Sequence, residues 1–263
     1  MSSTSKIEWT QRTWNPVAGC FKVSQGCRHC YAIRNVHRMA GNPNQAMRDA
    51  YSGLTKDIGG TINWTGIVRV LPGRLLEPLS WRKPAMVFVN SLSDLLHEDL
   101  PDHEIKKVFE VMNIAHQHTL QVLTKRSVNL LRLSPELPWP DNVWMGVSVE
   151  NEACVHRIDD LRVSGAAIKF LSLEPLLGPL PKLNLSGIDW VIVGGESGPN
   201  SRIMKLEWVV DIRDQCVAAG VKFFFKQWGA HDETGTRVGK KKAGRILDGR
   251  TWDEMPDIGT AKV

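Results

Sequence analysis

Short runs of apolar residues, many of them β-branched or aromatic, recur along the chain after its first third. Several are nearly continuous in apolar character, a pattern typical of strands that are buried on both faces of a parallel sheet. The runs are GIVRVL (66–71), MVFV (86–89), LQVL (120–123), VWMGVSV (143–149), IKFLSL (168–173), DWVIVG (189–194) and VKFFF (221–225). The pattern therefore predicts seven strands in this part of the chain.

Segments with helical periodicity separate many of these runs. In 103–117 the apolar residues recur at the spacing of one helix face, and Asp102 is the predicted N-terminal cap. Two further helices are predicted over 152–165 and 207–220, and the second of these ends at Gly220. Strands that alternate with helices through short links indicate βαβ units.

The predicted architecture is an α/β fold of the (β/α) barrel type, whole or partial. An eighth strand around Thr13–Val17 leads directly into a cysteine-rich loop, and eight strands favour a TIM-like barrel over an open doubly wound sheet. We expect residues 1–230 to form this barrel. Residues 231–263, rich in Gly and Lys and without clear periodicity, are expected to form a basic C-terminal extension.

Composition adds a weak indication about partners and location. The 263 residues carry a formal net charge of +5, which suggests an anionic partner. Much of the excess lies in GKKKAGR (239–245), so a merely solvated basic tail is an equal alternative. The first residues have no apolar segment typical of a signal peptide, and no run of about 18 apolar residues occurs. We therefore expect a cytoplasmic protein with reduced thiols and no membrane partner.

Polar residues stand at the end of every predicted strand from MVFV onward. This is where barrel sites form, although each residue taken alone is as compatible with a structural hydrogen bond as with a ligand contact. These residues are Asn90, Ser91, Asp94, Thr124, Lys125, Arg126, Ser148, Glu150, Ser172, Glu174, Glu196, Ser197, Gln227 and Trp228. We expect four of them to face one cavity at the barrel mouth, namely Lys125, Glu150, Glu174 and Glu196.

Three cysteines lie close together in CFKVSQGCRHCY, at Cys20, Cys27 and Cys30. A structural zinc site needs a fourth protein ligand, and His29 is poorly placed between two of the cysteines. A [4Fe–4S] cluster accepts three thiolates and leaves one iron for a small molecule. Three reduced core thiols are a further alternative, but SQGCRHCY is polar and rich in turn-forming residues. The cluster is the favoured interpretation.

With these motifs in hand, the chain resembles the radical S-adenosylmethionine (SAM) superfamily. More narrowly it resembles phage-associated three-cysteine-motif proteins of unknown function. The blocks that carry the resemblance are EWTQRTWNPVAGC, GCRHCYA, FVNSLSDLLHE, LTKR, GVSVEN, SLEPLLGP, VIVGGESGP, FFFKQWG and AGRILDGRTWDEMP. In the superfamily the cluster chelates SAM, and one electron from a donor cleaves SAM to a 5′-deoxyadenosyl radical.

The resemblance implies roles for particular residues. Cys20, Cys27 and Cys30 would be the cluster ligands. The candidates for contacts to SAM are Asn90, Ser91, Lys125, Ser148 and Glu150. Apart from the resemblance, their positions at strand ends make Lys125, Glu150, Glu174 and Glu196 the candidates for catalytic roles.

The chain also departs from the superfamily pattern. Six residues replace the common three between the first two cysteines, and the aromatic Tyr31 follows the third cysteine instead of preceding it. In the superfamily a Gly-Gly-Glu block after the second strand contacts the SAM amino group. Here Gly194–Glu196 follows the seventh predicted strand, and the predicted second strand (66–71) has no such block. The contact to the amino group is therefore unassigned.

Three functions remain open from the sequence. The first is a radical SAM enzyme that modifies an unidentified substrate, with nucleic acid or a nucleotide favoured by the basic charge. The second is a phage-associated nucleic-acid-binding protein whose metal only shapes a loop. The third is a barrel hydrolase that uses pairs of Glu150, Glu174 and Glu196. In the extension we expect Ile246, Leu247 and Trp252 to dock on the barrel, while Lys240–Lys242 stay exposed.

Overall fold

The structure is a computed structural model that describes residues 5–257, and the chain separates into two compact units. The first unit comprises Met1–Met145 and Val163–Ala167, and the second comprises Gly146–Arg162 and Ile168–Val263. The boundary between them passes through strand β8 (Val143–Ser148). Among the described residues no helix is long and apolar enough to span a membrane.

Seven strands follow one another as neighbours in a single sheet, in the order β1-β6-β7-β8-β9-β10-β11. The pairs β1–β6, β6–β7, β9–β10 and β10–β11 are parallel. The bounds of the strands other than β8 are β1 (Arg12–Trp14), β6 (Met86–Val89), β7 (Thr119–Thr124), β9 (Ile168–Leu173), β10 (Trp190–Gly194) and β11 (Lys222–Gln227). The described residues therefore have a mixed α/β fold that is consistent with a partial (β/α) barrel.

The predicted strand over 66–71 is wrong. Only β5 (Arg69–Val70) is extended there, and it pairs antiparallel with β2 (Val17–Ala18) outside the seven-stranded sheet. Gly66, the first residue of the run, has a φ of 90° and bends the chain there, and Pro72 starts a 3₁₀ turn directly after the run. The second strand of the sheet is therefore β6, which ends next to Asn90.

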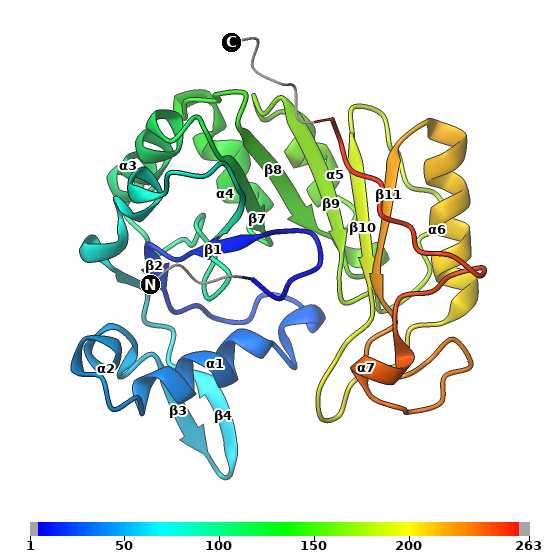
Figure 1. Ribbon diagram of the computed structural model, residues 1–263, viewed down its shortest axis with the longest axis horizontal. Helices are drawn as coiled ribbons and strands as arrows, with labels where there is room; N and C mark the ends of the chain where they lie inside the picture. Colours follow the sequence, from blue (N-terminus) through cyan, green and yellow to red (C-terminus); the bar gives the residue numbers. More distant parts are fainter. Residues whose placement is uncertain (1–4, 258–263) are drawn as a thin grey trace. The chain divides into compact units, whose positions relative to one another are not determined.

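The long connection between β1 and β6 carries two helices and a hairpin that lie together at the lower left of Figure 1. These are α1 (Tyr31–Ala40), α2 (Gln45–Tyr51), β3 (Thr55–Ile58) and β4 (Thr61–Trp64). Their apolar residues form a small core around Val36, Tyr51 and Leu54, all fully buried. Cys20 and Cys30 pack against this core, so the cysteine loop is attached to a folded support.

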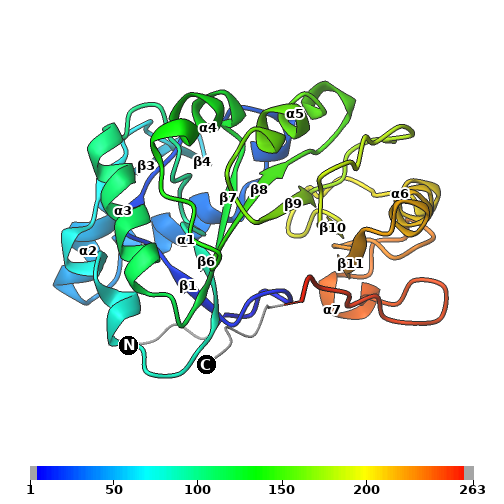
Figure 2. The same cartoon turned by 90° about the horizontal axis from the view of Figure 1, so that it is seen from above.

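Two further helices of the first unit follow β6 and β7, and Figure 2 shows both beside these strands. They are α3 (Asp102–Ile114) and α4 (Ser127–Leu133). The predicted cap at Asp102 is wrong, because Pro101 occupies the cap position and its side chain offers no acceptor. Asp102 instead lies in the first turn, where its carboxylate accepts hydrogen bonds from Arg132 at 2.6 and 2.7 Å.

The second unit contains α5 (Arg157–Arg162), α6 (Leu206–Ala219) and α7 (Lys240–Ala243). The helix predicted over 152–165 is shorter than expected, because a 3₁₀ turn replaces its first part. Gly220 ends α6 with a φ of 69°, as predicted from the glycine. The 3₁₀ helices within residues 5–257 are η1 (Gln25–Cys27), η2 (Pro72–Arg74), η3 (Glu77–Ser80), η4 (Ser134–Glu136) and η5 (Glu152–Cys154).

The segment after α7 covers strand β11, beside which it runs as the red trace in Figure 1. The Phe225 amide donates to the carbonyl of Trp252, and Phe224 forms an antiparallel bridge with Asp253. Leu247 is fully buried and Trp252 is 9% exposed, as expected for docked residues, whereas Ile246 is 51% exposed and its predicted docking is wrong. The backbone carbonyl of Ile246, rather than its side chain, makes the contact, by accepting from Trp228 Nε1.

Candidate functional site

The cysteine loop begins at a position that only glycine can occupy. Gly19 has a φ of 92°, and a Cβ added there would come within 2.1 Å of the carbonyl oxygen of Ile67. Gly19 also bridges to Ser93, whose hydroxyl donates to the carbonyl of Val17. The chain therefore delivers Cys20 at a fixed place beside the loop that follows β6.

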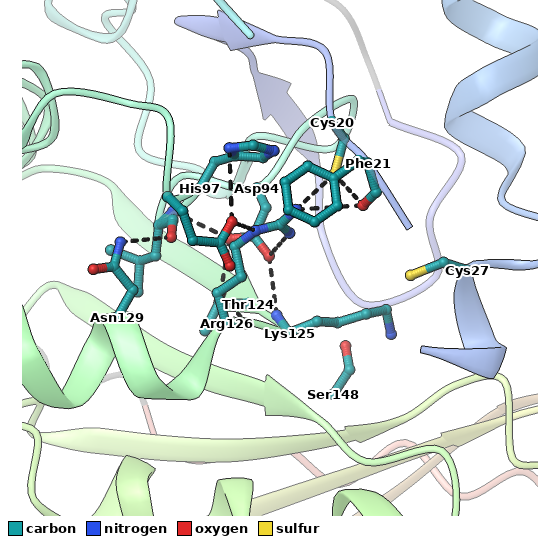
Figure 3. A network of polar contacts seen from close by, with 12 residues as sticks. Cys20, Phe21, Cys27, Asp94, His97, Thr124, Lys125, Arg126, Asn129 and Ser148 are labelled. Atoms are coloured by element: carbon teal, nitrogen blue, oxygen red, sulfur yellow. Dashed lines mark hydrogen bonds and ion pairs between the residues drawn. The ribbon is translucent and has the colours of Figure 1, made fainter. Parts of the chain in front are cut away.

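A buried arginine holds Cys20 in that place. Arg126, which follows β7, donates from Nη2 to the sulfur of Cys20 at 3.5 Å and to the carbonyl of Phe21 at 3.3 Å (Figure 3). The guanidinium carbon also lies 4.8 Å from the centre of the Phe21 ring. One side chain thus fixes the sulfur, the backbone and the neighbouring ring.

Two carboxylates hold Arg126 in turn. Its Nη1 donates to Asp94 at 3.0 Å, and its Nε donates to Glu98 at 2.7 Å. Asp94 is 6% exposed and also accepts from the Thr124 hydroxyl and the Lys125 amide. Asp94 therefore joins the loop after β6 to the loop after β7, and the arginine is oriented before anything binds.

Burial and the neighbouring positive charge have opposite effects on the pKa of Cys20. Burial raises the pKa of Cys20 to about 12, although the Arg126 guanidinium acts in the opposite direction. Burial alone would lower the pKa of Arg126, but Asp94 and Cys20 raise it, so this cation keeps its charge. A thiolate formed at Cys20, for example by metal binding, would have a permanent cation in contact with it.

The other two cysteines flank the start of α1. Cys27 ends the 3₁₀ turn η1 and is 9% exposed, and its sulfur lies 3.7 Å from the Ser24 hydroxyl. Cys30 is the N-terminal cap residue of α1. Burial raises the pKa of Cys30, whereas hydrogen bonds from the amides of Ala32 and Ile33 lower it. A thiolate at Cys30 is favoured by these amides and by the helix dipole.

The three thiols influence one another without forming a ready metal site. The charge of Cys30 acts on the pKa of Cys20, and that of Cys27 acts on the pKa of Cys30. Within residues 5–257, no three His, Cys, Asp or Glu side chains are arranged to hold a metal ion. The kinds of group present nevertheless fit an iron–sulfur cluster, because the loop carries three thiols, with a guanidinium beside Cys20 and a helix N-terminus at Cys30 that favour thiolates.

Asn90 carries the clearest sign of a missing partner. It follows β6 with a φ of 60°, it is 3% exposed, and neither its amide nitrogen nor its amide oxygen has a hydrogen-bond partner. Its own backbone amide is held by the carbonyl of Trp14 at 2.7 Å. Because buried polar atoms are normally paired, both amide atoms of Asn90 are candidates for contact with a bound water or a ligand.

The neighbouring candidates Ser91 and Lys125 are placed by the same loops. The Ser91 hydroxyl donates to Asn15 at 3.2 Å, and its carbonyl accepts from the Tyr31 hydroxyl at 2.8 Å. The Lys125 ammonium is close enough to lower the pKa of Cys30. The first unit therefore brings Asn90, Ser91 and Lys125 to the loops that hold the cysteines.

The remaining sequence candidates lie in the second unit, where each glutamate has a basic partner. Glu174 binds the Lys226 ammonium through both carboxylate oxygens, at 2.7 and 2.8 Å. Glu196 accepts from the side chain and the backbone amide of Arg202, with distances between 2.5 and 2.9 Å. These pairs neutralise the carboxylates and fix the loops that follow β9 and β10.

Glu150 is fully buried and binds Arg157 at 3.0 Å. Arg157 also donates to the carbonyl of Ser148, at the end of β8, at 2.7 Å. Burial raises the pKa of Cys154, as does its hydrogen bond to Glu150. Because Lys125 belongs to the first unit and the three glutamates to the second, the cavity that they are expected to share stays a prediction.

The Gly-Gly-Glu block owes its glycines to packing inside the second unit. A Cβ on Gly195 would lie 1.9 Å from the carbonyl oxygen of Trp228, and a Cβ on Gly194 would lie 3.3 Å from the Glu174 carboxylate. Gln227 completes the contact by donating to the carbonyl of Gly195. The close approach is therefore between two backbone segments of the same sheet.

Asp94 and Arg126 were among the polar residues predicted at strand ends, but no role was predicted for them. His97 was not predicted as a site residue. His97 is fully buried, and its Nδ1 accepts from the amide of Asp99, so Nε2 carries the proton and has no partner. Its ring meets Phe21 edge-on with centres 4.7 Å apart. The only signal in the sequence was the run of polar residues in SLSDLLHE, which does not say which of them face the cysteines.

Comparison with known protein families identifies the family of this chain but gives no function for it. The profile of the family described as "Protein of unknown function (DUF5131)" matches residues 4–256, so the chain belongs to that family. No curated protein and no solved structure gave a significant match.

Proposed function

We propose that this member of the DUF5131 family is a radical SAM-like iron–sulfur enzyme. The observation that carries the proposal is the neighbourhood of the three cysteines, in which a buried guanidinium, an ammonium and a helix N-terminus all favour thiolates. Within the described residues, no Asp, Glu or His side chain is grouped with two of these cysteines. Three sulfurs without a fourth protein ligand are the donor set that leaves one iron for a small molecule.

Cys20, Cys27 and Cys30 would hold the cluster in this proposal. When bound, the [4Fe–4S] cluster supplies one electron, taken from an external donor, to SAM, which divides into methionine and the 5′-deoxyadenosyl radical that takes a hydrogen atom from the substrate. The chain itself orients the sulfurs through Arg126 and through the small core on which the cysteine loop packs. Arg126 balances part of the negative charge that three thiolates bring into a partly buried site.

The side chains after β6 are the proposed SAM contacts. Since the run 66–71 does not join the sheet, β6 is its second strand, and Asn90 and Ser91 directly follow β6. In the superfamily this place contacts the SAM amino group, and the unpaired amide oxygen of Asn90 can accept from an ammonium. Lys125 is the proposed partner of the SAM carboxylate. Ser148, Glu150, Glu174 and Glu196 stay candidates without an assigned contact.

The test is anaerobic purification and reconstitution with iron and sulfide, followed by metal and sulfide analysis. We expect equal amounts of iron and sulfide in the native chain, an electron paramagnetic resonance signal after reduction, and a change of that signal when SAM is added. Replacing Cys20, Cys27 or Cys30 by Ala should abolish the cluster. Cys154→Ala and Cys216→Ala are the controls and should keep it, because both cysteines lie in the second unit. Stoichiometric zinc without iron that can be reconstituted would refute the proposal.

A further inference from the structure

The positive charge of the chain is concentrated around the cysteine loop. From Trp9 to Arg48 there is no Asp or Glu, while the segment contains Arg12, Lys22, Arg28, Arg34, Arg38 and Arg48. A stretch of 40 residues without a carboxylate is unusual in a chain with 28 acidic residues. An anionic partner is therefore better matched here than at the exposed lysines of α7 alone.

Part of this charge forms a row on one face of α1. Tyr31, Arg34 and Arg38 are exposed and follow the spacing of three and four residues that brings side chains together on a helix. The exposed Arg28 precedes them in the loop between Cys27 and Cys30. The helical part of the row spans about 10 Å, from the rise of 1.5 Å per residue.

The arginines of the row lack the carboxylate partners that seven arginines elsewhere in the described chain have. Within the residues that the structure describes, Arg28, Arg34 and Arg38 make no ion pair. Seven arginines elsewhere bind a carboxylate, namely Arg126, Arg132, Arg157, Arg162, Arg202, Arg213 and Arg245. Arg34 and Arg38, four residues apart on one helix, repel each other unless an anion lies between them.

An aromatic ring at the beginning of the row indicates the kind of anion. Tyr31 is 48% exposed although it is aromatic, and its hydroxyl is fixed to the carbonyl of Ser91 at 2.8 Å. A fixed, half-exposed ring beside a line of cations matches the surfaces on which single-stranded nucleic acids stack their bases and lay their phosphates. The face is not suited to insert into a lipid surface, because the apolar residues of α1, Ala32, Ile33 and Val36, are buried in the protein.

We propose that the α1 row, consisting of Arg28, Tyr31, Arg34 and Arg38, binds a single-stranded nucleic acid next to the three cysteines. Cys30 is the cap residue of α1, so a strand on this row passes directly beside the cysteine loop. Binding to the row does not depend on a cluster. The further statement that the bound strand is the substrate rests on the function proposed above.

The test measures binding of a labelled single-stranded oligonucleotide to the full chain by fluorescence anisotropy over a range of salt concentrations. The double variant Arg34→Gln/Arg38→Gln should weaken binding and lower the slope of log K against log salt by about 1.4, since each lost phosphate contact on a single strand contributes about 0.7. The variant Arg34→Lys/Arg38→Lys keeps the charge and should keep most of the slope. Tyr31→Leu should weaken binding more than Tyr31→Phe, which retains a ring.

The matched control removes the same charge from α7, as Lys241→Gln/Lys242→Gln, and should leave binding nearly unchanged. Loss of binding in this control, but not in Arg34→Gln/Arg38→Gln, would overturn the proposal in favour of the tail. Equal or tighter binding of an acidic peptide or of anionic lipid vesicles would overturn the choice of nucleic acid. Measuring iron in the same samples separates the two proposals, because a chain that binds the strand but never binds iron refutes only the enzyme.

Discussion

The Arg126 guanidinium donates to the sulfur of Cys20 across 106 positions of sequence. It joins the cysteine loop to the loop after β7, and Asp94 and Glu98 hold it there. The cysteine loop is therefore fixed by an ion-pair network whose members come from three separate segments. Its consequences for stability can be measured without any cofactor.

Replacing Arg126 by Met should destabilise the chain strongly. The change leaves the carboxylate of Asp94, which is 6% exposed, without its cation, and uncompensated buried charges cost about 3–5 kcal/mol. The matched control is Arg132→Met, which breaks the exposed pair with Asp102 and should cost about 0–1 kcal/mol. Urea unfolding at neutral pH measures the free energy of unfolding of both variants. Equal losses in the two variants would show that the buried network around Arg126 stabilises the chain no more than the exposed pair does.

Gly19→Ala should cost much more than Gly53→Ala, although both glycines have positive φ angles of 92° and 76°. Each variant carries the penalty of about 1–2 kcal/mol for a left-handed alanine. Only at Gly19 does the new Cβ also meet backbone, at 2.1 Å from the carbonyl oxygen of Ile67, whereas nothing lies within 4 Å of it at Gly53. Thermal unfolding of the two variants should differ clearly, and equal melting temperatures would contradict the close approach at the cysteine loop.

Cys216 should make stability depend on alkaline pH. Burial raises the pKa of this fully buried thiol from 9.0 to about 12. Its contribution is complete below the pKa of the unfolded chain and is lost as pH rises from about 9 towards 12, because only the unfolded chain releases the proton. Between these values the loss is about 1.4 kcal/mol per pH unit. Under reducing conditions, Cys216→Ala should lose less stability between pH 8 and pH 10.5 than the native chain, and parallel losses would contradict the shift.

The segment after α7 should contribute to stability through Trp252. Trp252 is 9% exposed, its Nε1 donates to Leu247, and its ring meets that of Phe223. Replacing Trp252 by Ala should cost about 3–5 kcal/mol, the range for large aromatic residues removed from a core. Ile246→Ala, at a residue that is 51% exposed, is the control and should cost far less. Similar losses of unfolding free energy in the two variants, measured by chemical denaturation, would show that Trp252 does not anchor the segment on β11.

The sequence predicted β6 to β11 because each is a largely apolar run followed by polar residues, whereas β1 (Arg12–Trp14) is short and polar and was placed around Thr13–Val17. The prediction was wrong at 66–71. This segment is mostly apolar, but Gly66 and Pro72 limit its extended part to two residues. Apolar runs do not reveal where a backbone turns, so local chemistry prevailed over periodicity there. The same limit explains why Asp102 was taken for a cap that Pro101 occupies.

The candidate site was predictable in its sulfurs but not in their surroundings. The spacing of Cys20, Cys27 and Cys30 drew attention to them, and Cys30 raises the pKa of Cys20 while Cys27 raises that of Cys30; their role as cluster ligands stays a prediction. The pairing of Arg126 with Cys20 was not predictable, since no local pattern links positions so far apart. Nor did the sequence indicate that Asn90 would be buried with an unpaired amide, because that depends on how the loops after β1 and β6 pack.

The separation between Cys20 and Arg126 also sets an order of events during synthesis. The chain grows at about 5–20 residues per second, so the cysteines leave the ribosome roughly 5–20 s before the arginine that holds them. Strand β1 waits in the same way for β6, its partner in the sheet. During that interval the cysteine thiols of the nascent chain are accessible to oxidants and to metal ions. Arg126 can hold Cys20 only after the chain has grown past it, so the cysteine loop takes its final form late in synthesis.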